Sequence, residues 1–164
     1  MVEVAIDSIR ISLVSQHRIV MLRDTDSDRQ LPIWIGPCEA EAITIELQDV
    51  EIARPVTHDL LKNTIKEMGG KVSHILINEL RDQVFYARLV VDQKGNQLEI
   101  DCRPSDAIAL AVRVKVPIFV NEAVMDEAAI VPEPDITDKD ESENLDAFKN
   151  FVDSLNFDDF GGES

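Results

Sequence analysis

The sequence predicts an α/β (α+β) domain in which helices pack on a mixed, largely antiparallel sheet. Three observations support this fold class. Apolar and polar residues alternate in segments between residues 2 and 35, three further extended segments follow one another between residues 71 and 102, and three helical patterns each begin beside a proline. At 164 residues, 45% of them hydrophobic, the chain is long enough for one compact core.

The N-terminal segments predict a three-strand meander. Residues 2–15 alternate in a strand pattern whose phase slips once near Asp7 and Ser8, which predicts a β-bulge. Residues 17–24 are the expected hairpin partner, and the polar turn at 25–29 leads to a third strand at 30–35.

The helices and the second meander follow in order. A helix is expected over 38–50, with Pro37 at its first position, and a second helix runs from an N-cap at Thr57 to the stop at Gly69-Gly70. Short polar turns separate the three strands of a second meander and lead to a last helix, which Ser105 would cap, and a short strand. These elements are expected at residues 71–80, 83–92, 97–102, 105–115 and 117–120.

Charge separates the chain into two parts. The formal net charge is -16, but residues 121–164 carry 14 acidic and 2 basic side chains, which leaves a net charge of -4 on the rest. Residues 1–131 are therefore interpreted as the domain, and residues 132–164 as an acidic linker followed by a short amphipathic helix. The apolar stripe of that helix is expected to dock on the core or on a partner subunit.

Several classes of function are disfavoured by missing patterns. The chain has no apolar run long enough to cross a bilayer and no secretory leader pattern, so we expect a cytoplasmic protein without a membrane partner. It has no glycine-rich phosphate loop, no CxxC pair and no HExxH motif. Cys38 and Cys102 fit a reducing compartment and are interpreted as buried structural thiols, with a soft-metal site that includes His58 as the alternative.

Three proline junctions share one design. In each, an extended segment ends at a proline and a helix begins with an acidic residue in its first turn. The residues are Pro37 with Glu39, Arg54-Pro55 with His58 and Asp59, and Arg103-Pro104 with Ser105 and Asp106. Helix initiation alone accounts for much of this design, because a carboxylate in the first turn of a helix complements the helix dipole and contributes about 0.3–1 kcal/mol.

The two arginines and the carboxylates around them also suggest phosphodiester chemistry. Arg54 and Arg103 precede helix N-termini, where a guanidinium and free N–H groups could hold a phosphate together. Asp101 lies two residues before Arg103 and therefore on the same face of an extended segment. Asp101 and Asp106 could bind a hard divalent ion such as Mg²⁺ or Mn²⁺, and His58 could transfer a proton near neutral pH.

Four segments carry a resemblance to a known family. The stretches "LPIWIGPCEAEAI", "RPVTHDLL", "VFYARL" and "RPSDAIALAVRVKVPIFV" occur in the order typical of the bifunctional nucleases, and the chain resembles that family over residues 1–130. The resemblance implies an α/β domain that forms homo-oligomers, and a nuclease (hydrolase) acting as both DNase and RNase. The positions that match its motifs are Glu39, Arg54, His58, Asp59, Arg103, Ser105 and Asp106.

Two hypotheses remain open at this point. The first is a metal-assisted nuclease that binds DNA or RNA. Its candidate catalytic residues are Glu39, His58, Asp59, Asp101 and Asp106, its candidate substrate-binding residues are Arg54, Arg103 and Ser105, and its candidate metal ligands are Asp101 and Asp106. The second is a non-catalytic oligomeric module that binds an anion or a protein partner. The lack of a basic stripe, the few aromatic residues and the net charge weigh against the nuclease.

Overall fold

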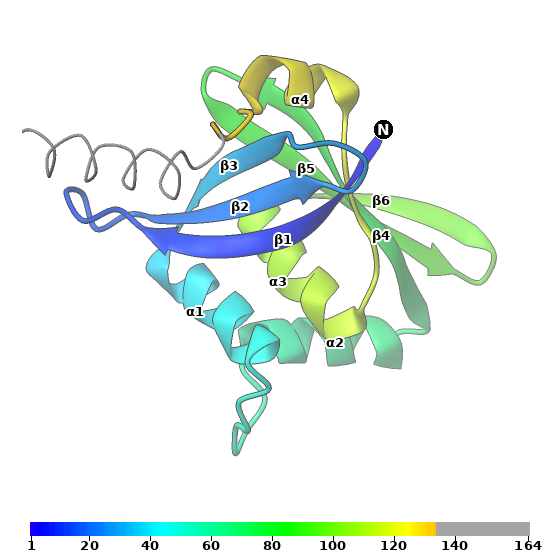
Figure 1. The fold of residues 1–164 in the computed structure, drawn as a ribbon. Coiled ribbons are helices and arrows are strands. Elements are labelled where there is room, and N and C mark those ends of the chain that lie inside the picture. Colours follow the sequence, from blue (N-terminus) through cyan, green and yellow to red (C-terminus); the bar gives the residue numbers. More distant parts are fainter. Residues whose placement is uncertain (134–164) are drawn as a thin grey trace, which may run out of the picture. The chain divides into compact units, whose positions relative to one another are not determined.

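The computed structural model describes residues 1–133. Within them, the chain forms one seven-stranded sheet and four helices (Figure 1). The strands are β1 (Val2–Ile11), β2 (Arg18–Asp24), β3 (Gln30–Ile35), β4 (Gly70–Arg81), β5 (Val84–Gln93), β6 (Asn96–Cys102) and β7 (Ile118–Val120). The helices are α1 (Pro37–Leu47), α2 (Thr57–Glu67), α3 (Pro104–Val114) and α4 (Glu122–Ala128). The expected fold class, an α+β domain with a mixed and mostly antiparallel sheet, is confirmed.

Two antiparallel meanders build the sheet, and β7 joins them. The strand order is β3-β2-β1-β7-β4-β5-β6. The three residues of β7 pair antiparallel with β1 and parallel with β4, so β7 holds the two halves together at the centre of the sheet. The predicted bulge in β1 is confirmed, because the register with β2 shifts between Ile6 and Ser8.

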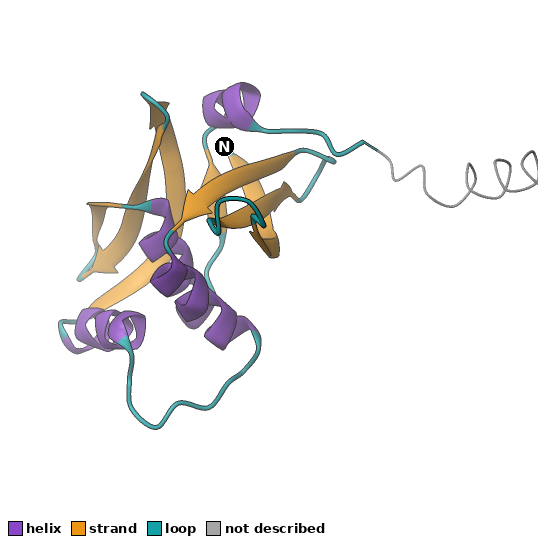
Figure 2. Cartoon of the chain, turned by 90° about the vertical axis from the view of Figure 1, so that its left-hand side faces the viewer, coloured by secondary structure: helices purple, strands orange, loops and turns teal. Residues whose placement is uncertain are grey.

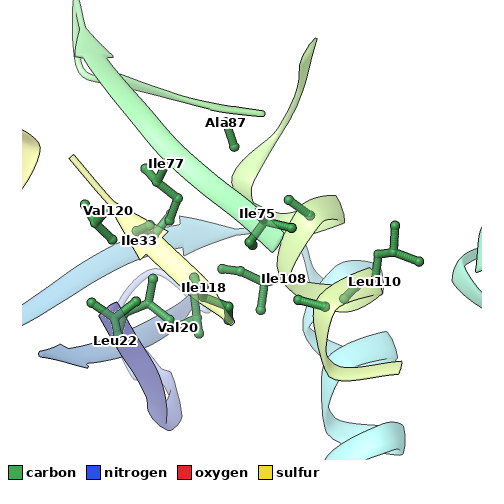
Figure 3. Close-up of a cluster of buried hydrophobic side chains, with 14 of the residues drawn as sticks. Val20, Leu22, Ile33, Ile75, Ile77, Ala87, Ile108, Leu110, Ile118 and Val120 are labelled. Carbon is green, nitrogen blue, oxygen red and sulfur yellow. The ribbon is translucent and has the colours of Figure 1, made fainter. Parts of the chain in front are cut away.

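Helix α3 lies at the centre of the helical layer. It is the crossover between β6 and β7, and in Figure 1 it runs beneath β1 with α1 and α2 beside it. Ala107, Ala109 and Ala111 are at most 2% exposed, and such small side chains let the helix approach its neighbours closely. The sheet and the helix share one apolar core (Figure 3), to which Val20, Leu22, Ile75, Ile77, Ile108, Ile118 and Val120 contribute.

Helix α4 covers the opposite side of the sheet from α1, α2 and α3 (Figure 2), and the sequence patterns did not predict it. Its N-cap is Asn121, whose side chain accepts a hydrogen bond from the Ala123 amide at 3.4 Å. Arg29, in the β2–β3 turn, contacts Glu122 at 2.8 Å and the buried carboxylate of Asp24 at 3.0 Å. These ion pairs link α4 to the first meander.

The helix caps differ from the prediction. Thr57 is the first residue of α2 and Val56 is the N-cap, while α3 begins at Pro104 with Arg103 as the N-cap. Neither Thr57 nor Ser105 caps its helix with a side-chain hydrogen bond. At the start of α2, the Asp59 carboxylate instead accepts a hydrogen bond from the Val56 amide at 3.0 Å. Pro104 suits the first helical position because its fixed φ matches a helix and its missing N–H would have no partner there.

Two further expectations concern membrane-spanning helices and the extent of the domain. None of the helices in the described part of the chain is long and apolar enough to span a bilayer. Residues 1–132 form one compact unit. The predicted acidic linker and amphipathic helix fall almost entirely on residues 134–164, which lie outside the described residues.

Candidate functional site

Arg103 joins the starts of two helices. Its Nη2 donates to Glu39 Oε1 at 2.7 Å, and its Nε donates to Asp106 Oδ2 at 2.8 Å. Glu39 lies in the first turn of α1 and Asp106 in the first turn of α3, so both carboxylates sit where the helix dipole favours negative charge. The Arg103 side chain nevertheless remains 65% exposed. One accessible guanidinium is therefore held in place by two carboxylates.

His58 reaches the same carboxylate from a third helix. It is the second residue of α2, its side chain is only 9% exposed, and its Nε2 lies 3.1 Å from Asp106 Oδ1. An ionised carboxylate only accepts hydrogen bonds, so the neutral imidazole is assigned the tautomer with the proton on Nε2. The unprotonated Nδ1 is then the basic atom. We call Glu39, His58, Arg103 and Asp106 the junction cluster.

The charges of the junction cluster stabilise one another. Burial raises the pKa of Asp106, but the hydrogen bonds from Arg103 and His58 outweigh it and hold that pKa below its usual range. Hydrogen bonds to Asp106 and Glu39 raise the pKa of Arg103 further above its usual value. Asp106 is thus a carboxylate and Arg103 a cation throughout the physiological pH range.

Gly36 makes room for Glu39. A Cβ atom at Gly36 would collide with Oε2 of Glu39, because that side chain folds back over the start of α1. The backbone of Gly36 is extended and imposes no need for glycine, so the constraint comes from the close approach alone. The "GP" pair therefore does more than end β3, since Gly36 leaves space for the Glu39 carboxylate as it lies against Arg103.

Asp59 has a structural partner rather than a place in the junction cluster. Its Oδ1 accepts from Nε of Arg113 at 2.8 Å, and the Arg113 side chain is 1% exposed. Arg113 also donates to the carbonyls of Ala109 and Ala42, at 2.7 and 2.9 Å. One buried guanidinium thus connects α1, α2 and α3 and fixes the start of α2, which carries His58.

The junction cluster separates two depressions in the surface. The larger one has a volume of about 930 Å³ and lies between α2, β5 and β6. The smaller one, of about 380 Å³, lies between α1 and α2. His58, Arg103 and Asp106 line both, so a ligand in either depression could reach them. The larger depression has mostly apolar walls, which include Leu60, Leu61, Ile65, Val84, Phe85 and Ile100.

Three other candidate residues lie apart from the junction cluster or are buried. Asp101 lines the larger depression, but its carboxylate is 66% exposed and pairs with Arg88 at 3.4 Å. Arg54 is exposed in the loop before α2 and lines a different depression, together with Lys62. Ser105 is 6% exposed inside α3. The structure therefore brings together Glu39, His58, Arg103 and Asp106, and it does not bring Arg54 to them.

A divalent ion does not fit the carboxylates as they are arranged. Both oxygens of Asp106 already accept hydrogen bonds, and Glu39 and Asp101 each pair with an arginine. Within residues 1–133, no group of three or more His, Cys, Asp or Glu side chains is placed to hold a metal ion. Metal binding by Asp101 and Asp106 stays a prediction.

The cysteines differ from each other. Cys38 is exposed at the start of α1, which corrects the expectation that both thiols are buried. Its place in the first turn, with its side chain at the rim of the smaller depression, explains the exposure. Cys102 is half-buried at the end of β6, and burial together with the charge of Asp101 raises its pKa to about 11. Cys102 is thus a neutral thiol near pH 7.

Sequence reasoning missed Arg113 and the apolar walls of the larger depression. A signal for Arg113 was present, because this charged residue occurs in the otherwise apolar segment "AIALAVRV", where burial requires a partner. The wall residues of α2 gave no such signal. Leu60 and Leu61 have the spacing of an ordinary apolar helix face, yet they are 62% and 38% exposed.

The fold and the junction cluster define an α+β domain whose three helix starts meet at an arginine, two carboxylates and a histidine. Residues 20–133 match the family model of the bifunctional nuclease domain, and the chain belongs to that family. An uncharacterized protein of Mycobacterium tuberculosis is 39% identical over 163 residues, which cover 96% of this chain and 97% of that protein.

Plant proteins match over the domain alone. Bifunctional nuclease 1 of Oryza sativa subsp. japonica is 34% identical over 111 residues, which cover 66% of this chain and 34% of the rice protein. Bifunctional nuclease 1 of Arabidopsis thaliana is 32% identical over 107 residues, 63% of this chain and 33% of that protein. The match therefore spans about a third of the plant nucleases.

Proposed function

We propose that this chain hydrolyses phosphodiester bonds in DNA and RNA at the junction cluster. One observation carries the proposal: Arg103 is exposed but held by Glu39 and Asp106, and His58 contacts the other oxygen of Asp106. A cation for the phosphate and a base for water thus meet at one place. Membership of the bifunctional nuclease domain family supports the same chemistry.

Arg103 is the proposed phosphate-binding group. Its Nε and Nη2 are occupied by the two carboxylates, and within residues 1–133 its Nη1 makes no hydrogen bond. Nη1 can therefore donate to a non-bridging phosphate oxygen without breaking either anchor. A guanidinium that is already fixed loses less conformational freedom on binding than a free one.

His58 is the proposed proton-transfer group, with Asp106 as its positioning residue. Nδ1 accepts a proton from water as the water oxygen attacks phosphorus. The bond from phosphorus to the leaving oxygen breaks on the opposite side of phosphorus, solvent water protonates that oxygen, and the imidazolium releases its proton to solvent. The products are a phosphomonoester and an alcohol. The carboxylate of Asp106 stabilises the imidazolium while it exists.

The larger depression favours a second candidate function, an oligomeric binding module. Leu60, Val84 and Ile100 line it and are 62%, 51% and 46% exposed. A group of exposed apolar side chains around one depression is typical of a surface that binds another molecule. Under this proposal a second copy of the chain covers them, and the ion pairs of the junction cluster serve folding and assembly.

A cleavage assay with two matched histidine variants tests the proposed function. Wild type is incubated with single-stranded DNA and with RNA, in a divalent metal and in a chelator, and compared with His58→Gln and His74→Gln. His74 lies on β4, packs edge-on against Phe119, and is absent from both depressions beside the junction cluster.

The nuclease proposal expects wild type and His74→Gln to cleave and His58→Gln to lose activity by roughly 10²–10⁴-fold. Activity that survives in His58→Gln contradicts the assignment. If wild type cleaves neither substrate in any condition, the binding module is the better description. Loss of cleavage in the chelator alone shows that a metal takes part.

A further inference from the structure

A third depression gathers most of the lysines of the domain. It has a volume of about 670 Å³ and lies where the end of α2, the start of β4 and the end of α3 meet. Four of the five lysines in residues 1–133 line it, namely Lys62, Lys66, Lys71 and Lys115. All four are exposed, and none forms an ion pair with another described residue. We call this surface the lysine depression.

The lysine depression is locally positive in an acidic protein. Asp92 is the one carboxylate among its lining residues in the described part of the chain. Arg113 also lines it, but the Asp59 carboxylate neutralises that guanidinium. Four ammonium groups thus face one carboxylate, whereas the whole chain has a formal net charge of -16. The concentration of positive charge is a local property that the composition conceals.

Helix termini explain only half of this cluster. Lys66 lies in the last turn of α2 and Lys115 is the C-cap of α3, where cations complement the helix dipole. That explanation does not extend to Lys71, which is in a strand, or to Lys62, which is in the middle of α2. Lys62 and Lys66 are four residues apart and so lie on one face of the helix.

Helix α2 connects the lysine depression to the junction cluster. His58 is near its N-terminus and Lys66 near its C-terminus, and eight residues at about 1.5 Å each separate them by about 12 Å along the axis. A stacked nucleic-acid strand advances about 3.4 Å per nucleotide, so this length corresponds to roughly three or four nucleotides. A strand with one phosphate at Arg103 can therefore place phosphates roughly three or four nucleotides further along among the lysines.

We propose that the lysine depression binds the sugar-phosphate backbone of a single nucleic-acid strand that runs along α2 from the junction cluster. The inference rests on the proposed function and names how the substrate is held. Lysine is a point charge with a flexible stem, so it contacts phosphates without reading bases. The binding is independent of sequence and weakens with salt. The lysine depression is thus the basic surface that the sequence pattern did not reveal.

The salt dependence of binding tests this proposal. Fluorescence anisotropy of a labelled oligothymidylate is measured over a series of salt concentrations, with chelator present and in a His58→Gln background so that the strand stays intact. Lys66→Gln/Lys71→Gln is compared with Arg10→Gln/Arg23→Gln, which removes the same charge. Arg10 and Arg23 are exposed on β1 and β2 and do not line the lysine depression.

The Lys66→Gln/Lys71→Gln variant should have a slope of log Kd against log salt that is lower by about 1.4, since each lost phosphate contact to a single strand accounts for about 0.7. The arginine pair should leave the slope unchanged. Equal effects of the two pairs, no effect of the lysine pair, or no salt-dependent binding at all would overturn the proposal. Lysine-dependent binding of the strand in a protein that cleaves nothing would support the lysine depression and overturn the nuclease function instead.

Discussion

The imidazole of His58 and the carboxylate of Asp106 are 3.1 Å apart, although the residues are separated by 48 positions in the chain. The first residue belongs to α2 and the second to α3. Arg103 holds the other oxygen of that carboxylate at 2.8 Å. Asp106 is therefore the point at which the histidine and the arginine are connected, and changing it affects both.

Replacing Asp106→Asn should reduce cleavage by roughly 10²–10⁴-fold and alter stability much less. Arg103 requires an acceptor, so the introduced amide turns its oxygen toward Arg103 and its NH₂ group toward His58. Nε2 must then accept, and the proton moves to Nδ1, which is no longer a base. Single-turnover cleavage and thermal unfolding of the same samples check this. Unchanged cleavage would show that Asp106 does not position His58.

Replacing Arg113→Met should lower the free energy of unfolding by about 3–5 kcal/mol, because it breaks the ion pair with Asp59 and removes the guanidinium bonds to two buried carbonyls. Urea unfolding measures the change. Arg10→Met is the control, since this side chain is exposed on β1 and surface substitutions usually stay within about 0.5 kcal/mol. Similar losses in both variants would contradict the role given to Arg113.

The turn between β2 and β3 should lose stability in acid. Hydrogen bonds from Ser27 and the Asp26 amide, with Arg29 nearby, hold the pKa of Asp24 below its ordinary value of 3.8. A lowered pKa in the folded state contributes stability above the unfolded pKa, and that contribution disappears as the pH falls through the folded value. Asp24→Asn should therefore be less stable than wild type at pH 7, and the difference should shrink below about pH 4.

Urea unfolding at several pH values measures this difference, with Asp28→Asn as the control. Asp28 is exposed in the same turn, so its replacement should leave stability unchanged at each pH. A difference between wild type and Asp24→Asn that persists undiminished in strong acid would contradict the account.

The two thiols should react at different rates. The thiolate is the nucleophile, and the pKa of Cys102 is raised to about 11, so Cys102 is almost entirely neutral at pH 8. Cys38 is exposed. Brief treatment with iodoacetamide followed by peptide mass spectrometry should find Cys38 alkylated and Cys102 unmodified. Both should react in urea, and fast labelling of Cys102 in the native protein would contradict its burial and raised pKa.

Local patterns predicted most strands and helices but not how they are assembled. The alternation in β1 and its phase slip are properties of neighbouring residues, and the bulge was predicted from them. The central place of β7 depends on pairing with β1 and β4, which are remote in sequence. Helix α4 has seven residues and a weak apolar pattern, so it owes its formation to packing rather than to propensity.

Local sequence patterns also identified the residues of the junction cluster, but not the fact that they meet. The three proline junctions identified Glu39, His58, Arg103 and Asp106 as candidates because each lies at a helix start. Their convergence depends on the packing of α1, α2 and α3, which the buried Arg113 connects through Asp59 and the carbonyl of Ala42. Arg54 shares the local design but lies in an exposed loop away from Arg103, so the local pattern alone did not distinguish the two arginines.

The most direct test of the account is a double-mutant cycle on the cleavage rate. His58→Gln, Arg103→Gln and the double variant are compared with wild type on one labelled single-stranded substrate, with circular dichroism as a check of folding. Groups that act as one unit are strongly non-additive, so the double variant should lose little more activity than either single variant. Losses that multiply, or full activity in either single variant, would contradict a single catalytic site at the junction cluster.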